Sequence, residues 1–317
     1  MKKGIAMLLA GLSLFAAPAA HAEDVKITGE VTVKYERDTA QGDPAVSGTM
    51  STLKLNLEKE LGSGLSLYTR LGAQYATQPA LADFNTAAYA ENTRSVAALD
   101  QFGLIYKAGG LTYKLGRQDM TIGTEDLLYK RNDEKVGKHA LVDGLTVTGQ
   151  VGAVEVSAYA VREDNEAGNP RGKIYAVRTG YSPTEKLNWG LTLGRYQNEA
   201  AGSTNHWAVD GKYGFDKHSF AAQYTKSSRS VDNKGYVLNW TYDFNGTTAL
   251  SLIAFRMEAA GSIGGQSEFD SDNKGFYYTL THKVSEAANL EVVYKDQQQI
   301  SDGKKNAKFE AKMSYTF

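Results

Sequence analysis

One segment of the sequence, residues 119–139, combines carboxylates and cations at close spacing. Its charged residues are Asp119, Glu125, Asp126, Lys130, Arg131, Asp133, Glu134, Lys135 and Lys138. Such a set acts on charged solutes through its field rather than through covalent chemistry. The apolar residues Leu127, Leu128 and Tyr129 can anchor the segment against a wall. Thr124 precedes two acids in the way an N-cap does, so we expect a helical turn over TEDLLYK. A solvated surface loop, whose charges serve only solubility, is the alternative.

Covalent catalysis has little support elsewhere in the chain. The five histidines are His21, His139, His206, His218 and His282, and none has the HExxH or another metal-binding spacing. No GxSxG nucleophile elbow occurs, and the Gly-rich stretch 261–265 lacks the lysine of a phosphate-binding loop. We therefore expect no enzyme activity, no cofactor and no metal. The formal net charge of −1 gives no indication of a nucleic-acid partner.

The elements that must position the charged segment are strands, because apolar and polar residues alternate along almost the whole chain. The interpretation is an all-β chain of about 16 strands. They are expected near 24–37, 50–60, 65–76, 94–107, 111–118, 140–149, 152–162, 172–182, 187–197, 204–214, 217–227, 234–243, 248–258, 273–283, 288–298 and 307–317. Most run to 10 residues or more, the length that a tilted strand needs to cross a bilayer.

The connections between these strands alternate between long and short. Long ones are expected at 38–49, 77–93, 119–139, 163–171 and 259–272, and short ones at 61–64, 108–110, 150–151, 183–186 and 285–287. A soluble sandwich has no reason to sort its loops by length, whereas a transmembrane barrel has short periplasmic turns and long extracellular loops. The pattern favours a transmembrane antiparallel β-barrel.

The two ends of the chain agree with export and with barrel closure. Residues 1–22 have Lys2 and Lys3, an apolar run and a small-x-small ending, the layout of a cleaved signal peptide. The barrel domain is then residues 23–317. The chain ends in KFEAKMSYTF, whose apolar residues share one parity and finish on Tyr315 and Phe317. Since lipid cannot satisfy a free strand edge, we expect 307–317 to pair with 24–37.

The parity opposite the apolar one gives the residues that line a lumen. Basic candidates from the early strands are Lys34, Lys54, Arg70 and Lys114. Arg117 has the parity of Leu115, so it reaches the lumen only if its strand ends or bulges there. Polar inward residues are needed by any water-filled barrel, and a single charge therefore carries little weight.

With these features, the chain resembles the Gram-negative outer-membrane porins of the 16-stranded general-diffusion type. Two stretches make the resemblance more specific. One is the ending KFEAKMSYTF, and the other is LTYKLGRQDM (residues 111–120), which is similar to the strand that leads into the family's third loop. That loop folds back into the lumen and narrows it, which implies a constriction at 119–139. The resemblance further implies a basic wall (Lys34, Lys54, Arg70, Lys114, Arg117) facing the loop acids Glu125 and Asp126.

The same resemblance implies partners and location. It implies an outer-membrane protein surrounded by lipid, a homotrimer, and a C-terminal signal at Tyr315 and Phe317 for the barrel-assembly machinery. The trimer contact is expected at the outward positions of the early strands and at loop 77–93, which holds Ala80, Ala82, Ala87 and Ala88. The expected function is passive diffusion of small hydrophilic solutes and ions.

Three alternatives stay open from the sequence. An adhesin or receptor barrel would meet a partner through its outer loops while its lumen stays blocked. A soluble β-sandwich would need no membrane. Within the channel interpretation, the ion preference is open, because the negative net charge and the basic wall act in opposite directions.

Overall fold

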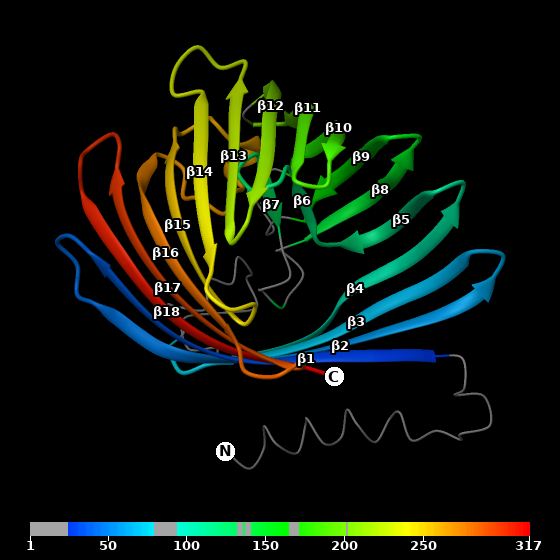
Figure 1. The fold of residues 1–317 in the computed structure, drawn as a ribbon, viewed down its shortest axis with the longest axis horizontal. Helices are drawn as coiled ribbons and strands as arrows, with labels where there is room; N and C mark the ends of the chain where they lie inside the picture. The colour runs from blue at the N-terminus through cyan, green and yellow to red at the C-terminus, as the bar shows by residue number, and fades with distance from the viewer. Residues whose placement is uncertain (1–24, 79–93, 132–135, 137–140, 165–170, 201) are drawn as a thin grey trace.

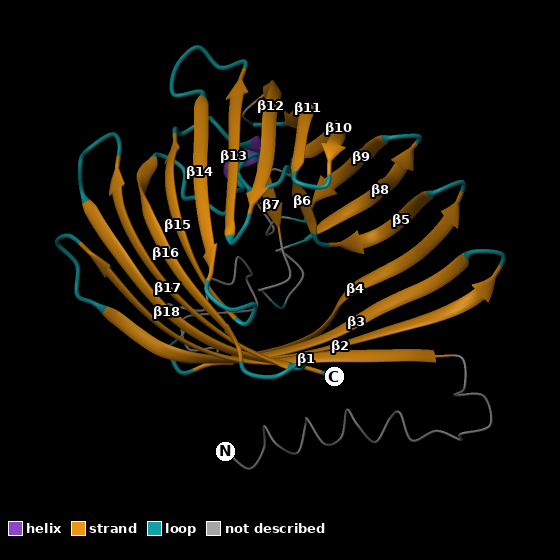
Figure 2. Cartoon of the chain, viewed as in Figure 1, coloured by secondary structure: helices purple, strands orange, loops and turns teal. Residues whose placement is uncertain are grey.

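The computed structural model describes residues 25–78, 94–131, 136, 141–164, 171–200 and 202–317. They form one closed antiparallel barrel of 16 strands, with a separate two-stranded hairpin inside it (Figure 1). The labels on the orange strands show that they follow one another around the ring in sequence order, so every connection in the wall joins neighbours (Figure 2). A sheet closed on itself excludes the sandwich alternative.

Each wall strand pairs with the next along the chain. The wall strands are β1 Val25–Ala40, β2 Val46–Gly62, β3 Leu65–Ala76, β4 Ser95–Ala108, β5 Leu111–Gln118, β8 Val142–Val151, β9 Val154–Glu163, β10 Lys173–Thr184, β11 Leu187–Asn198, β12 Gly202–Phe215, β13 His218–Ser227, β14 Lys234–Asp243, β15 Thr248–Met257, β16 Asn273–Lys283, β17 Ala288–Gln299 and β18 Lys305–Thr316. The inner hairpin is β6 Met120–Ile122 with β7 Tyr129–Arg131, and a short 3₁₀ turn, η3, spans Ile263–Gly265.

The sixteen predicted strands are all present, which confirms the fold class. One connection is shorter than predicted: β1 runs to Ala40 and β2 starts at Val46, so the expected loop 38–49 is mostly strand. The residues of the predicted signal peptide, 1–22, lie outside the described ranges. Within those ranges, no helix has the length and hydrophobicity that crossing a bilayer requires.

Side chains alternate between the two faces of the wall, except at a few β-bulges. Along β10, Ile174 and Ala176 are 0% and 5% exposed, whereas Tyr175 and Val177 are 48% and 50% exposed. The exposed parity is apolar in nearly every strand, as a lipid-facing surface must be. The buried parity faces the interior, where it is covered by the hairpin and by other loop residues.

The barrel closes between its first and last strands, as the sequence predicts. Val31 lies opposite Tyr315, and Val33 lies opposite Met313. Beyond the last paired strand residue, Phe317 and Gly29 exchange two backbone hydrogen bonds of 2.7 and 3.0 Å. The Phe317 ring lies over Gly29 so closely that a Cβ there would come within 2.3 Å of it. The terminal aromatic therefore completes the seam.

Candidate functional site

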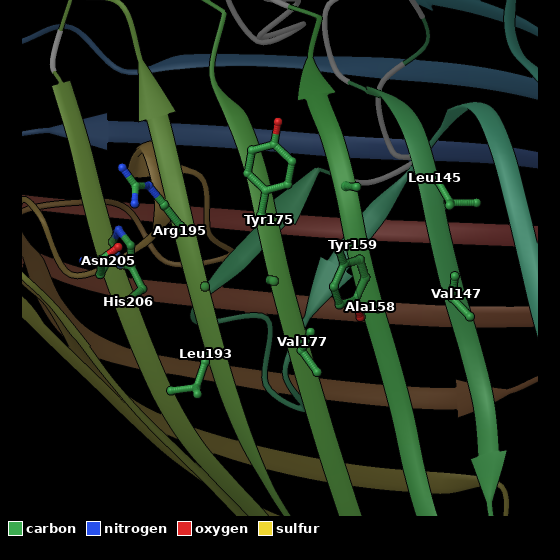
Figure 3. A pocket seen from close by; sticks show the side chains of 13 residues that line it. Leu145, Val147, Ala158, Tyr159, Tyr175, Val177, Leu193, Arg195, Asn205 and His206 are labelled. Carbon is green, nitrogen blue, oxygen red and sulfur yellow. The ribbon is translucent and has the colours of Figure 1, made fainter.

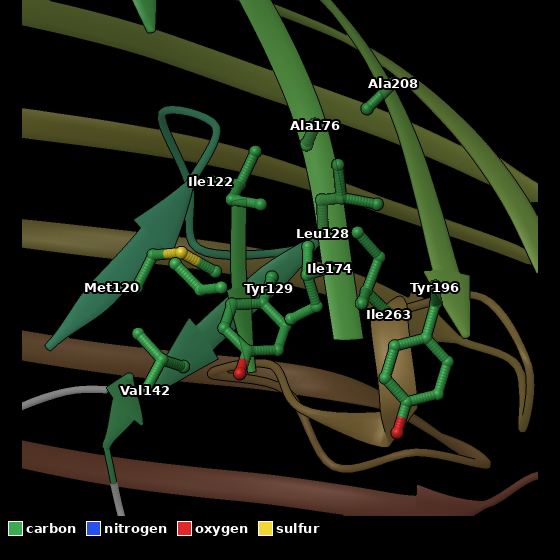
Figure 4. Close-up of a cluster of buried hydrophobic side chains, with 11 residues drawn as sticks. Met120, Ile122, Leu128, Tyr129, Val142, Ile174, Ala176, Tyr196, Ala208 and Ile263 are labelled. Carbon is green, nitrogen blue, oxygen red and sulfur yellow. The ribbon is translucent and has the colours of Figure 1, made fainter. Parts of the chain in front are cut away.

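The charged segment after β5 does not extend into solvent but folds back inside the barrel as the β6–β7 hairpin (Figure 1). Its apolar side chains Met120, Ile122, Leu128 and Tyr129 are at most 4% exposed. They pack on inward-facing residues of β8 to β12 and on Ile263 (Figure 4). Because burying a large apolar side chain contributes about 1.5–3 kcal/mol, this cluster holds the hairpin firmly against one side of the lumen.

A carboxylate beneath the hairpin fixes it further. The hydroxyls of Tyr129 and Tyr196 donate to the two oxygens of Glu163, at 3.3 and 2.9 Å. The Arg131 guanidinium lies 3.7 Å from the same carboxylate and donates to the Leu141 carbonyl. Burial and the neighbouring Glu163 raise the pKa of Tyr129, so its phenol stays protonated and acts as the donor. Glu163 is therefore the polar centre of the attachment.

The tip of the hairpin reaches the wall at β13 and β14. The Gln223 side-chain oxygen accepts hydrogen bonds from the backbone N–H groups of Glu125 and Leu127, at 3.2 and 3.4 Å. Asn239 donates to the Glu125 carboxylate at 2.9 Å. Burial raises the pKa of Glu125, and the Asn239 hydrogen bond only partly offsets this effect. Glu125 is thus held at a defined place on the lumen wall.

The predicted helical turn over TEDLLYK does not form. Asp126 takes a positive φ of 55°, which interrupts a helix, and Tyr129 to Arg131 form strand β7 instead. The physical reason is that Leu127 and Leu128 are both fully buried but belong to different clusters. An extended backbone can send these neighbours in different directions, and a helical turn cannot. The prediction that Leu127, Leu128 and Tyr129 anchor the segment is confirmed.

The same loop also reaches the opposite wall. The backbone N–H of Val136 donates to the Gln74 side chain on β3 at 3.2 Å. A Cβ at Gly72 would come within 2.7 Å of the Val136 side chain, so this glycine makes room for the loop. β3 and β13 lie eight strands apart in either direction around the closed ring. The segment therefore crosses the lumen. Asp133, Glu134, Lys135 and Lys138 lie outside the described residues.

A second loop, residues 258–272 between β15 and β16, also folds inward, which the sequence did not indicate. Backbone hydrogen bonds join it to the hairpin: Ile263 N–H donates to the Leu128 carbonyl at 2.9 Å, and Glu268 N–H donates to the Asp126 carbonyl at 3.1 Å. Its Phe269 packs with Phe255 and Tyr277 next to Leu127. The two loops thus form one inner layer.

An ion-pair network joins this layer to the barrel wall. Glu268 lies between Lys130 of the hairpin and Lys295 of β17, at 2.9 and 3.1 Å. Lys130 also lies 2.8 Å from Asp126. Burial opposes ionisation of Glu268, but the two ammonium groups outweigh it and lower the pKa of Glu268 to about 2. The pairs therefore stay charged over the physiological range.

Four of the five predicted basic wall residues face inward, and each contacts a carboxylate. Lys34 lies 2.6 Å from Glu36, and Lys54 lies 3.3 Å from Glu30. Their fields are therefore partly compensated by acids of the same wall, and do not act as bare positive charges.

The other two inward basic residues lie on β3 and β5. Arg70 makes a bidentate contact with Asp100, with both hydrogen bonds at 2.8 Å, and Asp100 is fully buried. Lys114 lies 3.7 Å from Asp119 and 4.6 Å from the centre of the Tyr68 ring. Asp100 reaches Arg70 because the β3–β4 register shifts between Arg70 and Leu71. A bulge of this kind breaks the parity rule, which is why the sequence did not reveal Asp100.

Arg117 differs from the prediction. It pairs with the outward residue Phe102, and its guanidinium lies 5.8 Å from that ring. It is held by Asp143 at 2.8 Å and by Asp164 at 3.2 Å. The strand does not bulge at this point, so Arg117 keeps the outward parity of Leu115 and stays out of the basic wall.

The arrangement as a whole offers charge and shape rather than reaction chemistry. Within the described ranges, no group of three or more His, Cys, Asp or Glu side chains is placed to hold a metal ion. Arg70 on β3 and the Gln223 site that holds Glu125 lie on opposite sides of the ring. The lumen therefore has ion-paired cations on one side and the carboxylate-bearing hairpin tip on the other.

Comparisons with known proteins agree with this geometry. Residues 6–299 match the Gram-negative porin family. Among solved structures, two mutants of the Rhodopseudomonas blastica porin each align with a TM-score of 0.61, covering 92% of this chain and 100% of theirs at 10% identity. A triple mutant of the same porin aligns with a TM-score of 0.60 at 9% identity. No curated protein matches the sequence. Because the family match spans most of the chain, this protein belongs to the Gram-negative porins, the diffusion channels of the outer membrane.

Proposed function

We propose that the β6–β7 hairpin is the constriction of this channel and sets the size of the hydrophilic solutes that pass. The observation that carries the proposal is the burial of Met120, Ile122, Leu128 and Tyr129 against the lumen wall. A segment attached in this way occupies part of the cross-section of the lumen and leaves a narrower passage for solutes. Selectivity then comes from the width of the remaining passage and from its charges.

The charges that act on solutes are those least compensated by neighbours. The basic residues Lys34, Lys54, Arg70 and Lys114 all contact acids. The Glu125 carboxylate instead accepts a hydrogen bond from the neutral Asn239 amide, and its backbone N–H donates to the Gln223 side chain. We therefore assign Glu125 a larger part in selectivity than any single basic wall residue. Porin family and fold are those of non-enzymatic channels, and the proposed activity includes no reaction and no cofactor.

Deleting residues 122–136 tests the constriction. In planar bilayers, the deletion variant should conduct more per channel and admit larger neutral sugars than the wild type. Shortening the exposed β1–β2 connection by residues 42–44 is the control and should change neither. If the deletion variant and the wild type have equal conductance and an equal solute cut-off, the hairpin is not the constriction.

The adhesin or receptor alternative makes a different prediction for the same experiment. A barrel that serves only as a scaffold for its outer loops has a blocked lumen and gives no conductance steps. Discrete ion steps from the purified wild-type protein support the channel.

The assembly is proposed to be a homotrimer, in keeping with the family. Its contacts would use outward residues of β1 to β5, such as Val33 and Leu99, which are 49% and 53% exposed. Loop 77–93, with Ala80, Ala82, Ala87 and Ala88, is expected to take part, although residues 79–93 lie outside the described ranges. Native mass spectrometry in detergent distinguishes a trimer from a monomer.

Export and insertion complete the proposal. Residues 1–22 would direct export and be removed, which N-terminal sequencing of the purified protein checks. Tyr315 and Phe317 would be read by the barrel-assembly machinery, and outer-membrane lipid would surround the apolar outer face.

A further inference from the structure

The turn between β14 and β15 contains a dipeptide with chemistry of its own. Asn245 and Gly246 form the only Asn-Gly dipeptide in the sequence, and both residues are exposed. Because glycine has no side chain, its backbone nitrogen is the least hindered nucleophile that can follow an asparagine. Gly246 takes a positive φ of 79°, which glycine adopts without strain. Attack of this nitrogen on the preceding side-chain amide would close a five-membered ring.

A carboxylate lies at the nucleophilic nitrogen. The Gly246 N–H donates to Oδ1 of Asp243 at 2.6 Å, and the Asn245 N–H donates to the same oxygen at 3.0 Å. A backbone nitrogen must lose its proton to attack, and a carboxylate that already accepts this N–H is placed to take the proton. Asp243 is the last residue of β14 and pairs with Ala249 of β15, so the strand ladder holds it in place.

The oxygen of the Asn245 amide is surrounded by donors. It accepts hydrogen bonds from the backbone N–H groups of Thr247 and Thr248, at 3.1 and 2.8 Å. The Thr247 hydroxyl donates to it as well, at 2.9 Å. When a nucleophile adds to this carbonyl, negative charge develops on the oxygen, and donors already in place stabilise it.

The leaving group of the same amide is accessible to water. Among the described residues, no hydrogen-bond acceptor contacts Nδ2 of the exposed Asn245. Asparagine side chains often accept backbone hydrogen bonds in turns for stability alone. The carboxylate at the Gly246 N–H and the uncontacted Nδ2 go beyond what such a turn needs.

We propose that Asn245 is a site of spontaneous deamidation. The Gly246 nitrogen bonds to Cγ of Asn245 and passes its proton to Asp243. The Cγ–Nδ2 bond breaks, and Nδ2 takes up one proton and leaves as ammonia. One water molecule then opens the cyclic imide at either carbonyl, which yields aspartate or isoaspartate. Water is the only co-reactant, and no electron is transferred.

The turn lies at the end of the barrel where the C-terminus is found. The Lys283 N–H donates to the Thr247 carbonyl, and the Thr316 N–H donates to the Ala287 carbonyl, both at 2.8 Å. This end carries the short turns and is therefore the periplasmic one. Each converted copy gains one negative charge at the periplasmic rim.

Peptide mapping of the purified wild-type protein in detergent tests the site. After incubation at mildly alkaline pH, the peptide with Asn245 should gain the mass of an amide-to-carboxylate change. Part of the product should be labelled by protein L-isoaspartyl methyltransferase, which direct hydrolysis of the side chain would not give. Asn205 on β12 is the internal control, because it is also exposed but lies in a paired strand before the bulky His206 (Figure 3). Conversion no faster at Asn245 than at Asn205 would overturn the proposal.

Three variants identify the groups that promote the reaction. Asp243→Asn should slow the conversion on the order of tenfold to a hundredfold, toward the lower end of the about 10²–10⁴ that a positioned base contributes. Asp216→Asn, the same change in the β12–β13 turn, is the matched control and should react as the wild type does. Thr247→Ala removes one donor and should slow the conversion less than Asp243→Asn does. Faster conversion in Asp243→Asn would mean that the contacts protect the amide, and the role given to the carboxylate would be wrong.

Gly246→Ala tests the nucleophile. A Cβ at this position has no heavy atom within 4 Å, so the turn has room for the added methyl group. The methyl group hinders the nitrogen, and conversion should fall below detection in protein that still shows the folded, heat-modifiable band. Undiminished conversion would exclude attack by the Gly246 nitrogen. The hydrogen bonds of this turn involve no residue of β6 or β7, so an unmodified Asn245 would leave the constriction proposal intact.

Discussion

At the hairpin tip, the Glu125 carboxylate accepts a hydrogen bond from the neutral side chain of Asn239, 2.9 Å away. The raised pKa of Glu125 follows from its burial, with repulsion from Asp126 adding to it. A carboxylate in this state loses its charge at a higher pH than an ordinary glutamate does. Its field on passing ions is therefore adjustable by pH.

We expect Glu125→Gln to shift the reversal potential in a salt gradient toward anions, because the variant lacks one lumen carboxylate. The wild type should show the same shift as the pH falls, with a midpoint above the ordinary value of 4.5. Since burial disfavours the ionised form, protonation of Glu125 also adds stability as the pH falls through its raised pKa. A pH-dependent shift of equal size in the Gln variant would assign the titration to another group.

Arg70 and Asp100 form the most enclosed ion pair of the wall, with side chains 4% and 0% exposed. Replacing Asp100 takes two charge-assisted hydrogen bonds from the buried Arg70 guanidinium. Asp100→Asn should therefore lower the unfolding free energy by about 3 kcal/mol, measured by urea unfolding in detergent. The double variant Arg70→Gln/Asp100→Asn should recover much of this loss. A single variant as stable as the wild type would show that water already screens the pair.

At the scale of elements, the inner layer depends on two loops that are distant in sequence. Glu268→Gln leaves Lys130 and Lys295 without the carboxylate that lies between them, so the two loops should separate more often. We expect more open-channel noise and faster proteolysis within 258–272, at unchanged barrel content by circular dichroism. Glu185→Gln, the same carboxylate-to-amide change in the exposed β10–β11 turn, is the control. Noise equal to that of the wild type would mean that the backbone hydrogen bonds alone hold the layer.

The pH dependence of this contact has a definite sign. The folded pKa of Glu268 is lowered to about 2, below its ordinary 4.5. The stabilisation is therefore complete above about 4.5 and is lost as the pH falls toward 2. Acidification to pH 4 should neutralise Glu125 well before it weakens the Glu268 contact, so selectivity should change before channel noise does.

The wall could be predicted from the sequence, but the inner layer could be predicted only in part. Period-2 alternation is a local property, and it was enough to place every wall strand and the seam. The inward hairpin came from resemblance, with Leu127, Leu128 and Tyr129 as its only local signal. Loop 258–272 resembles any polar outer loop in composition, and its role depends on contacts with residues more than 100 positions away, such as Asp126. Asp100 and Arg117 depend on whether a bulge is present, which parity alone does not reveal.

At the scale of the whole molecule, closure depends on the contact between Phe317 and Gly29. Deleting Phe317 removes two backbone hydrogen bonds and the ring over Gly29. Gly29→Val should disturb the same contact from the other strand. Both variants should reduce the folded, heat-modifiable species in the outer-membrane fraction, while channels that do form should conduct normally. Phe317→Tyr keeps the ring and is the control. A normal yield of folded protein without Phe317 would show that barrel closure does not depend on the terminal aromatic residue.

The central claim is that the hairpin tip borders the path of the ions. The chain has no cysteine, so Thr124→Cys introduces a single thiol at an exposed position of the tip. A cationic methanethiosulfonate reagent should lower the single-channel conductance of this variant in discrete steps. It should not affect Val231→Cys, whose position in the β13–β14 connection is 69% exposed. Conductance that stays unchanged while mass spectrometry shows full modification of Thr124→Cys would contradict the account.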